Sequence, residues 1–364
     1  MQTSEEIPGH LLRPEIMTEC RNYAIFRAGM RYNRTLKDLE AGKYIIAEGS
    51  FATALSLYSW IKKKTGHEYP VYDHSSSRAN RRIFSERSGR ILIRVKDHNP
   101  VLDKAPSIPW LKSFYRRSQE FMISLPDLLG MNGAWQWYSK GVKYQVLNHK
   151  LHPFYGVYFP TRTTHLMMLD DWLARNMKGF GLVADIGTGC GVLGFMAVKH
   201  GARAVYATDI NPNAIYSTSM DAYKTGLGKR INSIHGSFFG AAKDMKSADN
   251  GLVLFNPPWI PGKCNTLIDK GIYYEDGFFD EFFELAAEKV RPGSFIAVIF
   301  SDYAIVAGVA KRNPVEEAVK ANHNFVVVDK LTKKVQEKTG KLSRSWINSI
   351  RENETTELLI IKRS

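Results

Sequence analysis

The sequence predicts an α/β fold with a doubly wound, mostly parallel sheet of seven strands whose last strand is antiparallel. A mixed α+β accessory domain is expected ahead of it. From about residue 180 onward, short apolar runs alternate with amphipathic segments, the pattern of a parallel sheet with crossover helices. Residues 1–140 lack this alternation, and 364 residues exceed one typical domain. We therefore expect an accessory, substrate-recognition domain at 1–140 and a catalytic domain at 141–364.

The composition is that of a globular protein. Hydrophobic residues make up 44% of the chain and aromatic residues 12%, enough for a buried core. Residues 1–15 lack the apolar run of a signal peptide, and the best membrane candidate, 295–310, is interrupted by Ser301 and Asp302. The three cysteines form neither a disulfide framework nor a zinc motif. We expect a cytoplasmic protein with no membrane association and no metal site.

The positive charge is concentrated at the two ends of the chain. Residues 1–150 hold 24 Lys and Arg against 14 Asp and Glu, whereas residues 151–310 hold 14 against 15. The net charge of the whole chain is +14. A neutral core with basic flanks favours an anionic partner, and RNA contact through the N-terminal region is one hypothesis. A basic solvated surface without a partner explains the charge equally well.

The first domain gives few local signals. Residues 47–64 have helical apolar spacing and end in three lysines, which favours a helix. Residues 69–90 are rich in serine and arginine and predict a loop, and Ile91–Val95 predicts a strand. Arginines in that loop, among them Arg81, Arg82 and Arg87, either contact phosphates or form a solvated face.

A β-hairpin is predicted over residues 141–160, with Asn148 and His149 at its turn and an aromatic second strand. Thr163 or Thr164 then caps a helix. Strands are expected at 181–186, 204–209, 231–235, 251–256, 294–300, 324–329 and 357–362. Helices are expected at 191–200, 212–226, 277–290 and 303–321. Residues 332–353 are polar and basic, which favours a long excursion before an antiparallel final strand.

A cofactor site is predicted where the first strand of the sheet ends. Three glycines, Gly187, Gly189 and Gly191, follow Asp185 at alternate positions. Such glycines allow a sharp turn and the close approach of a ligand to backbone N–H groups. Asp209 ends the next strand, where a carboxylate accepts both hydroxyls of a ribose. The alternatives are a helix cap for Asp185 and a strand-end turn for Asp209.

The spacing of the glycines favours S-adenosylmethionine (SAM) over NAD. A dinucleotide turn has its third glycine one residue later, and Asp185 would repel a pyrophosphate but suits the ammonium group of SAM. Ser237 and Phe238, after the third strand, could supply the polar group and the apolar face that an adenine ring needs. Phe238 in the core is the alternative.

A chemistry site is predicted at Asn256-Pro257-Pro258-Trp259, directly after a buried strand. The prolines lack N–H groups, so the nearby carbonyls stay available as acceptors. A planar amino group could donate to Asn256 and to the Pro257 carbonyl, which aims its lone pair at a sulfonium methyl group. Trp259 would stack on the substrate. A rigid turn with a core tryptophan is the alternative.

These motifs resemble the class I SAM-dependent methyltransferases with an Asn-Pro-Pro-aromatic motif, whose sheet is Rossmann-like. Residues 158–164 and 269–277 resemble segments of the release-factor glutamine N-methyltransferases and of the related small-domain enzymes that act on ribosomal RNA. The resemblance implies that Gly187, Gly189, Asp209 and Asn256 contact SAM or substrate, and that Thr164 lies near the methionine end of SAM. It departs at Arg162, which lies two places after Pro160 instead of one, and at Trp259, where tyrosine or phenylalanine is commoner.

The expected function is N-methylation of a planar amide or amino nitrogen in a macromolecule, either a protein glutamine or an RNA or DNA base. A small-molecule acceptor is an alternative. A nucleic-acid-binding protein with a vestigial fold would show a damaged glycine turn or a lost Asn256, and an NAD-linked oxidoreductase would show the other glycine spacing. Neither is seen in the sequence.

Overall fold

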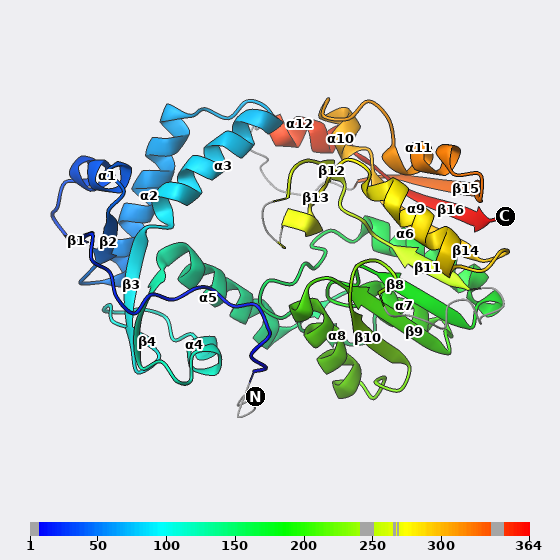
Figure 1. Cartoon of the computed structure of the whole chain (residues 1–364), viewed down its shortest axis with the longest axis horizontal. Helices are drawn as coiled ribbons and strands as arrows, with labels where there is room; N and C mark the ends of the chain where they lie inside the picture. Colours follow the sequence, from blue (N-terminus) through cyan, green and yellow to red (C-terminus); the bar gives the residue numbers. More distant parts are fainter. Residues whose placement is uncertain (1–6, 241–250, 265–266, 268, 336–345) are drawn as a thin grey trace. The chain divides into compact units, whose positions relative to one another are not determined.

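The computed structural model describes residues 7–240, 251–264, 267, 269–335 and 346–364. The chain divides into two compact units, residues 1–139 and 140–364, one residue from the expected boundary. Each unit is built around its own sheet (Figure 1). In the described residues no helix is long and apolar enough to cross a membrane.

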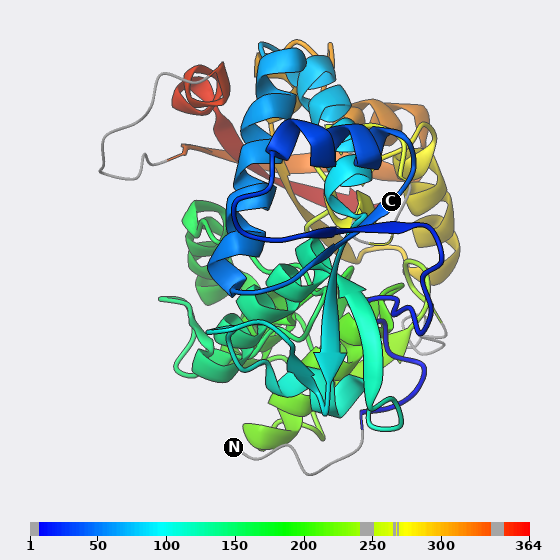
Figure 2. The same cartoon turned by 90° about the vertical axis from the view of Figure 1, so that its left-hand side faces the viewer.

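The first unit contains a mixed five-stranded sheet. β1 (Tyr23–Phe26), β2 (Tyr44–Ala47) and β3 (Ile91–Lys96) are parallel neighbours in that order. β4 (Asn99–Pro100) and β5 (Glu120–Ser124) pair antiparallel with β3, and Figure 2 shows β3 beside β5. The helices of this unit are α1 (Tyr32–Glu40), α2 (Phe51–Glu68), α3 (His74–Ser88), α4 (Pro109–Phe114) and α5 (Leu125–Lys140).

The predicted helix at 47–64 is present as α2, which begins after Ser50, whose hydroxyl accepts a bond from the Thr53 amide. The loop predicted at 69–90 is wrong, because residues 74–88 form α3. A capping box starts this helix: the Asp73 side chain accepts from the Ser76 amide, and the Ser76 side chain accepts from the Asp73 amide. The polar composition concealed a helix whose stability comes from its cap and from packing on α2.

The arginines of α3 differ in their surroundings. The Arg87 side chain is 11% exposed and forms ion pairs with Glu40 at 2.6 Å and Glu68 at 2.7 Å. Arg82 is largely exposed and pairs with Glu86, one turn along the same helix. Arg87 therefore ties α3 to α1 and α2 and is not available to a phosphate. From the sequence alone it is grouped with Arg81 and Arg82 as a phosphate contact or part of a solvated face.

The second unit contains a seven-stranded sheet that confirms the predicted α/β class. Its strands are β8 (Leu182–Ile186), β9 (Ala204–Asp209), β10 (Ile231–His235), β11 (Leu252–Phe255), β14 (Phe295–Ser301), β15 (Phe325–Lys334) and β16 (Thr355–Arg363). The spatial order is β10-β9-β8-β11-β14-β16-β15, and β16 is antiparallel to both of its neighbours. Because the strand order reverses between β8 and β11, their carboxyl ends open a crevice there.

Helices α6 (Thr164–Asn176), α7 (Val192–Lys199), α8 (Pro212–Lys224) and α9 (Phe278–Lys289) lie in the expected positions. Crossover connections are right-handed, so α7 and α8 cover one face of the sheet and α9 the other. The face under α9 is packed with aromatic rings, among them Phe255, Phe282 and Phe283.

The continuous helix predicted at 303–321 is wrong. α10 (Tyr303–Val306) ends before Gly308, whose φ is +71°, and α11 (Pro314–Ala321) restarts at Pro314 with its N-cap at Asn313. A left-handed glycine and a proline interrupt the helical hydrogen bonding. The polar segment before the last strand contains a short helix, α12 (Trp346–Asn353), and residues 336–345 lie outside the described part of the chain.

The hairpin predicted over 141–160 is present only as a two-residue pairing of β6 (Val142–Lys143) with β7 (Lys150–Leu151). The aromatic part, residues 152–160, is not a strand. Its backbone groups bond to side chains of α8 instead of to a neighbouring strand, as described below.

Candidate active site

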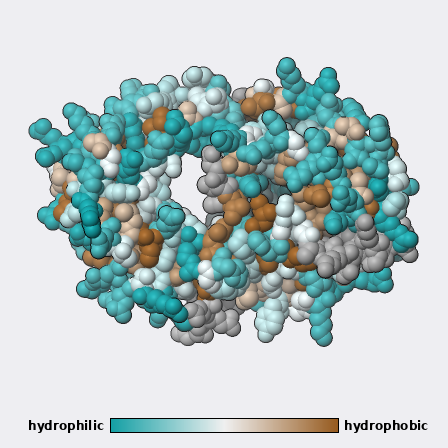
Figure 3. All heavy atoms as spheres, viewed as in Figure 1, coloured by the Kyte–Doolittle hydropathy of each residue, from teal (hydrophilic) through white to brown (hydrophobic). Residues whose placement is uncertain are grey.

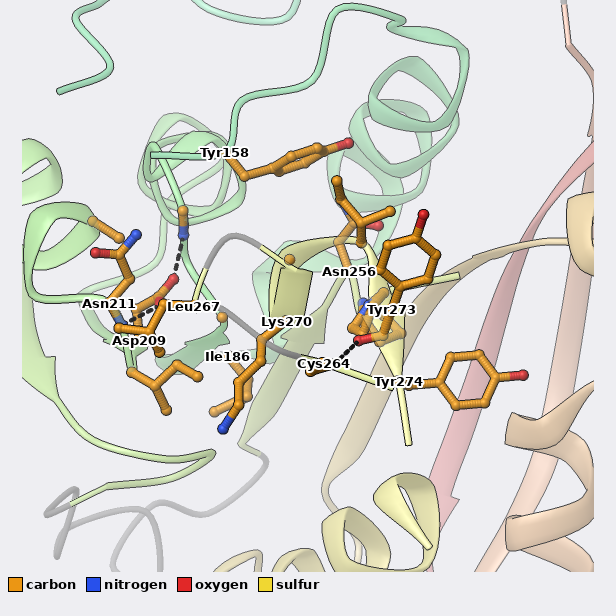
Figure 4. Close-up of a pocket in the computed structure, with 18 of the residues that line it drawn as sticks. Tyr158, Ile186, Asp209, Asn211, Asn256, Cys264, Leu267, Lys270, Tyr273 and Tyr274 are labelled. Carbon is orange, nitrogen blue, oxygen red and sulfur yellow. Dashed lines mark hydrogen bonds between the residues drawn. The ribbon is translucent and has the colours of Figure 1, made fainter. Parts of the chain in front are cut away.

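A cavity of about 750 Å³ lies at the carboxyl ends of β8, β9 and β11 (Figure 4). Its lining includes Gly187 and Gly189 after β8, Asp209 after β9, and Asn256 after β11. The volume is in the range of small-molecule sites. In the space-filling view, apolar side chains gather on the second unit beside β13 (Tyr273–Tyr274), which also lines the cavity (Figure 3).

The glycine turn requires its glycines. Gly187, Gly189 and Gly191 have φ values of +63°, +54° and +84°, which side chains rarely adopt. A Cβ on Gly189 would lie 2.9 Å from the carbonyl oxygen of Tyr158. Gly191 does not line the cavity, contrary to prediction: it precedes α7, and a Cβ there would meet Thr218 and Phe195. Of these three glycines, only Gly187 both lines the cavity and has open space where a Cβ would lie.

Asp209 is fixed by backbone donors on two sides. Its Oδ2 accepts from the Gly189 amide at 2.9 Å, and its Oδ1 accepts from the Asn211 amide at 2.8 Å. Burial raises the pKa of its carboxyl, and these two amides oppose the rise. Each oxygen keeps a second lone pair, so the group can still accept from a ligand in the cavity.

Asp185 lies behind the glycine turn, not in the cavity wall. It is fully buried, and its Oδ2 accepts from the Thr188 hydroxyl at 2.6 Å and from the Gly194 amide at 2.9 Å. Burial raises its pKa to about 6. Asp185 is not part of the cavity lining, and its Oδ1 is buried without a hydrogen-bond partner in the described residues, so its contact with the ligand stays a prediction. Its carboxylate ties the turn to α7, a role close to the capping alternative.

The segment 152–158 forms a strap along α8, a feature that the sequence did not reveal. The Asp221 carboxylate accepts from the His152 amide at 2.6 Å, and Ser217 accepts from the Phe154 amide at 3.1 Å. The side-chain amides of Asn213 and Asn211 donate to the carbonyls of Tyr155 and Gly156, at 2.7 and 2.8 Å. The polar face of α8 thus sets the course of the strap, which delivers Tyr158 to the cavity.

Ser237 and Phe238 line the cavity after β10, as predicted. The Phe238 carbonyl accepts from the Thr208 hydroxyl, and its φ of +44° is unusual for a phenylalanine. Its ring also packs against Phe278 and Phe282, so it serves the core and the cavity wall together. The core alternative for Phe238 is therefore confirmed, whereas its contact with an adenine ring stays a prediction.

Asn256, Pro257 and Pro258 line the cavity. The Oδ1 atom of Asn256 is buried and has no hydrogen-bond partner in the described structure. A buried amide oxygen without a donor costs about 1–3 kcal/mol, so this atom is a candidate acceptor for a ligand N–H.

Trp259 is not part of the cavity lining, and its stacking on the substrate stays a prediction. Its ring meets His165 edge-on, with centroids 5.6 Å apart and planes at 86°. His165 is 4% exposed, and burial lowers its pKa to about 4, which keeps it neutral. Trp259 also packs against the aromatic core under α9. This arrangement corresponds to the core-tryptophan alternative.

The segment after Trp259 covers the cavity. β12 (Ile260–Pro261) pairs with β13, and a short 3-10 helix, η3 (Asp269–Gly271), lies between them in sequence. Lys270, Tyr273 and Glu275 from this segment line the cavity, and Glu275 accepts from the Cys264 amide at 2.8 Å. These residues were not among the predicted site residues, because only the tertiary fold brings them over the ends of β8 and β11.

The residues before α6 are placed differently from expectation. Thr161 lines the cavity, whereas Thr164 is buried in the first turn of α6. Arg162 pairs with the buried Glu354 at 3.3 Å, and Glu354 accepts from the Ser301 hydroxyl at 2.7 Å. Arg162 therefore connects the residues before α6 to the end of β14, and it is not part of the cavity lining.

The charged side chains that line the described part of the cavity are mainly acidic. They are the carboxylates of Asp209, Glu275, Asp276 and Glu281 and the ammonium of Lys270. Such a lining disfavours a pyrophosphate and favours a cationic ligand. Within the described ranges no three His, Cys, Asp or Glu side chains converge as metal ligands.

Residues 135–248 match the family described as ribosomal protein L11 methyltransferase (PrmA). The chain is 38% identical over 71 residues to the ribosomal protein L11 methyltransferase of Psychrobacter cryohalolentis, which is 20% of this chain and 22% of that protein. It is 36% identical over 80 residues to the release factor glutamine methyltransferase of Moorella thermoacetica, or 22% of this chain and 27% of that protein.

A third relative matches over a longer stretch. The chain is 26% identical over 162 residues to a putative protein N5-glutamine methyltransferase of Methanocaldococcus jannaschii, or 42% of this chain and 75% of that protein. The chain thus spans about a quarter of the length of the first two relatives. The second unit is similar to SAM-dependent methyltransferases in the region that holds the glycine turn and Asp209.

Proposed function

We propose that this protein is a SAM-dependent methyltransferase that methylates a planar amide or amino nitrogen of a macromolecule, with a protein carboxamide as the lead acceptor. The observation that carries the proposal is the unpaired Oδ1 of Asn256, which lines the same cavity as Gly187, Gly189 and Asp209. An acceptor for a nitrogen nucleophile therefore lies beside a nucleoside-type site.

The lining residues fit SAM. Asp209 would accept from the ribose hydroxyls, Ser237 and Phe238 would hold the adenine, and the backbone at Gly187 and Gly189 leaves room for the remainder of the molecule. The mainly acidic lining suits a cation better than it suits the pyrophosphate of NAD. When bound, SAM supplies an electrophilic methyl group on a sulfonium.

Asn256 would orient the acceptor nitrogen. Its Oδ1 accepts one N–H, and the carbonyl of Pro257 is positioned in sequence to accept the second. Two such bonds localise the lone pair of the nitrogen and aim it along the direction of attack. Transfer of the methyl group to this nitrogen would break the sulfonium S–CH3 bond and leave S-adenosylhomocysteine, and the nitrogen would then release a proton to water, so this scheme needs no general base.

A protein acceptor is supported by two observations. The Psychrobacter, Moorella and Methanocaldococcus relatives are named for ribosomal protein L11, release factor and protein glutamine. The carboxylates in the cavity would also repel the phosphates beside a nucleic-acid base. A base amine in RNA is the second candidate, favoured by the basic composition of residues 1–150, with residues 1–140 as the substrate-recognition domain.

Calorimetry with SAM and with NAD tests the cofactor, and only SAM should bind. Tritiated SAM and cell lysate test the acceptor: a protein substrate gives label that protease removes and nuclease spares, and the reverse result assigns a nucleic acid.

Asn256→Ala should abolish transfer while keeping SAM affinity within about threefold. Asn232→Ala, at an exposed asparagine of β10, is the matched control. Full turnover by Asn256→Ala would refute the mechanism.

A further inference from the structure

Trp259 is not part of the cavity lining, so the proposed acceptor needs another flat surface beside Asn256. Two tyrosines of the cavity lining come from segments that lie far apart in the sequence. Tyr158 ends the strap along α8, and Tyr273 begins β13. In Figure 4 both lie toward the end of the cavity that holds Asn256, away from Asp209 and Asn211.

Tyr273 is held near Asn256 by backbone pairing. Tyr273 is the register partner of Ile260 in the β12–β13 pair, and Ile260 follows Asn256 by four residues. The Gly262 amide donates to the Tyr274 carbonyl at 2.8 Å, which extends this pairing. The side chain of Tyr273 is 6% exposed, so its position in the cavity wall is fixed by packing.

Tyr158 lines the same cavity from the strap, residues 152–158. Its carbonyl oxygen lies against Gly189, and its Cβ lies 3.7 Å from the position that a Cβ on Gly271 would take, two residues before Tyr273. The residue is nevertheless 49% exposed. A large aromatic ring with a fixed main chain and a half-exposed face, at the wall of a cavity, is a typical ligand contact.

We propose that Tyr158 and Tyr273 are the aromatic residues that position the acceptor carboxamide against Asn256, in place of Trp259. This inference rests on the proposed methyltransferase function and names the residues that determine its acceptor. Aromatic faces pack well on a planar amide, and a tyrosine adds a hydroxyl at its edge. Tyr274 is not part of the pair, because its ring packs on Phe279 with centroids 5.1 Å apart.

The test uses the full-length protein saturated with S-adenosylhomocysteine and N-acetylglutamine methylamide as the acceptor probe, with affinity followed by saturation-transfer NMR. Tyr158→Ala and Tyr273→Ala should each weaken probe binding about three- to tenfold and leave the affinity for S-adenosylhomocysteine unchanged. Tyr158→Phe and Tyr273→Phe should restore most of the binding, because the flat face is kept.

Trp259→Phe and Tyr223→Ala are the controls, and both should bind the probe as the wild type does. Tyr223 lies on α8 and is 79% exposed. Wild-type probe affinity in both tyrosine-to-alanine variants, or a loss in Trp259→Phe, would overturn the inference. No probe binding to the loaded wild type would also overturn it. Failure of the wild type to bind S-adenosylhomocysteine would instead refute the proposed function.

Discussion

The backbone amide of Gly189 donates a hydrogen bond of 2.9 Å to the Oδ2 of Asp209, which joins the turn after β8 to the end of β9. The two residues are 20 positions apart and come from adjacent parallel strands. The same carboxylate accepts from Asn211, the N-cap of α8. The fold therefore fixes the position of the Asp209 carboxylate in the cavity wall.

Asp209→Asn should lower SAM affinity about ten- to a hundredfold, because a hydrogen bond to a charged acceptor contributes about 1.5–3 kcal/mol. Isothermal titration calorimetry measures the change. Asp171→Asn, at an exposed carboxylate on α6, is the control and should bind SAM normally. An unchanged SAM affinity in Asp209→Asn would remove Asp209 from the proposed cofactor contacts.

Gly189→Ala should destabilise the second unit by about 1–3 kcal/mol and weaken SAM binding at least tenfold. The alanine would have to adopt the φ of +54° that Gly189 has, and its Cβ would lie 2.9 Å from the carbonyl oxygen of Tyr158 in the strap. Urea unfolding and calorimetry measure both effects. Gly66→Ala, inside α2 with open space around it, should instead stabilise by about 0.5–1 kcal/mol. A Gly189→Ala protein as stable as the wild type would contradict the strained turn.

Asp221→Ala should cost about 1–3 kcal/mol of stability and raise the Kd for SAM, because it leaves the partly buried amide of His152 unpaired and frees the strap. Ser217→Ala removes two hydrogen bonds to the strap, from the Phe154 amide and to the His152 carbonyl, but leaves the Asp221 carboxylate in place, so it should have a smaller effect in the same direction. Thr225→Ala is the control, since that hydroxyl bonds only to carbonyls of α8. Equal SAM affinity in all three variants would show that the strap does not shape the site.

Asp185 predicts a pH dependence of stability. Its folded pKa of about 6 lies above the unfolded value of about 3.9, so the folded state binds the proton more tightly. The stabilising contribution is complete below about pH 4 and is lost as the pH rises through 6, by up to about 3 kcal/mol.

Asp185→Asn should abolish this part of the pH dependence, because the amide oxygen can still accept from Thr188 and Gly194 and no longer titrates. Urea unfolding of both proteins between pH 4 and pH 7 measures it. If the difference in unfolding free energy between the two proteins stays constant across that range, the raised pKa is wrong.

Arg87→Ala should destabilise the first unit by about 1–2 kcal/mol, since it removes two ion pairs whose carboxylates are partly exposed. Arg82→Ala should change stability by less than about 0.5 kcal/mol. Thermal unfolding distinguishes the two.

The RNA hypothesis for residues 1–140 is tested at Arg81 and Arg82: charge reversal should weaken RNA binding and flatten its salt dependence. Unchanged binding would leave these arginines as a solvated face.

The strands of the second unit were predictable because each carries its own signal. Buried parallel strands are short apolar runs between turn residues, so β8, β9, β10 and β11 fall within one residue of expectation at either end. The helices of the first unit were less predictable. α3 is polar on most of its surface, and a capping box with a neighbouring helix decides its structure.

The candidate site shows the same division. Glycines before a helix and an acid at a strand end are local patterns, and Gly187, Gly189, Asp209 and Asn256 do line one cavity. Asp185, Gly191, Thr164 and Trp259 were predicted with them but are not part of the cavity lining. Sequence spacing specifies that a residue lies in a turn, whereas the packing of α6, α7 and the aromatic core specifies which way its side chain points.

The sequence by itself determined the α/β sheet, the left-handed glycine turn and the polar residues at the strand ends, because backbone conformation and hydrophobic periodicity act over a few neighbouring residues. Only the tertiary structure decided that Tyr158 and Tyr273 line the same cavity and that Trp259 packs against His165. Those contacts join segments about 100 residues apart, and they depend on side-chain hydrogen bonds and packing that no local pattern records.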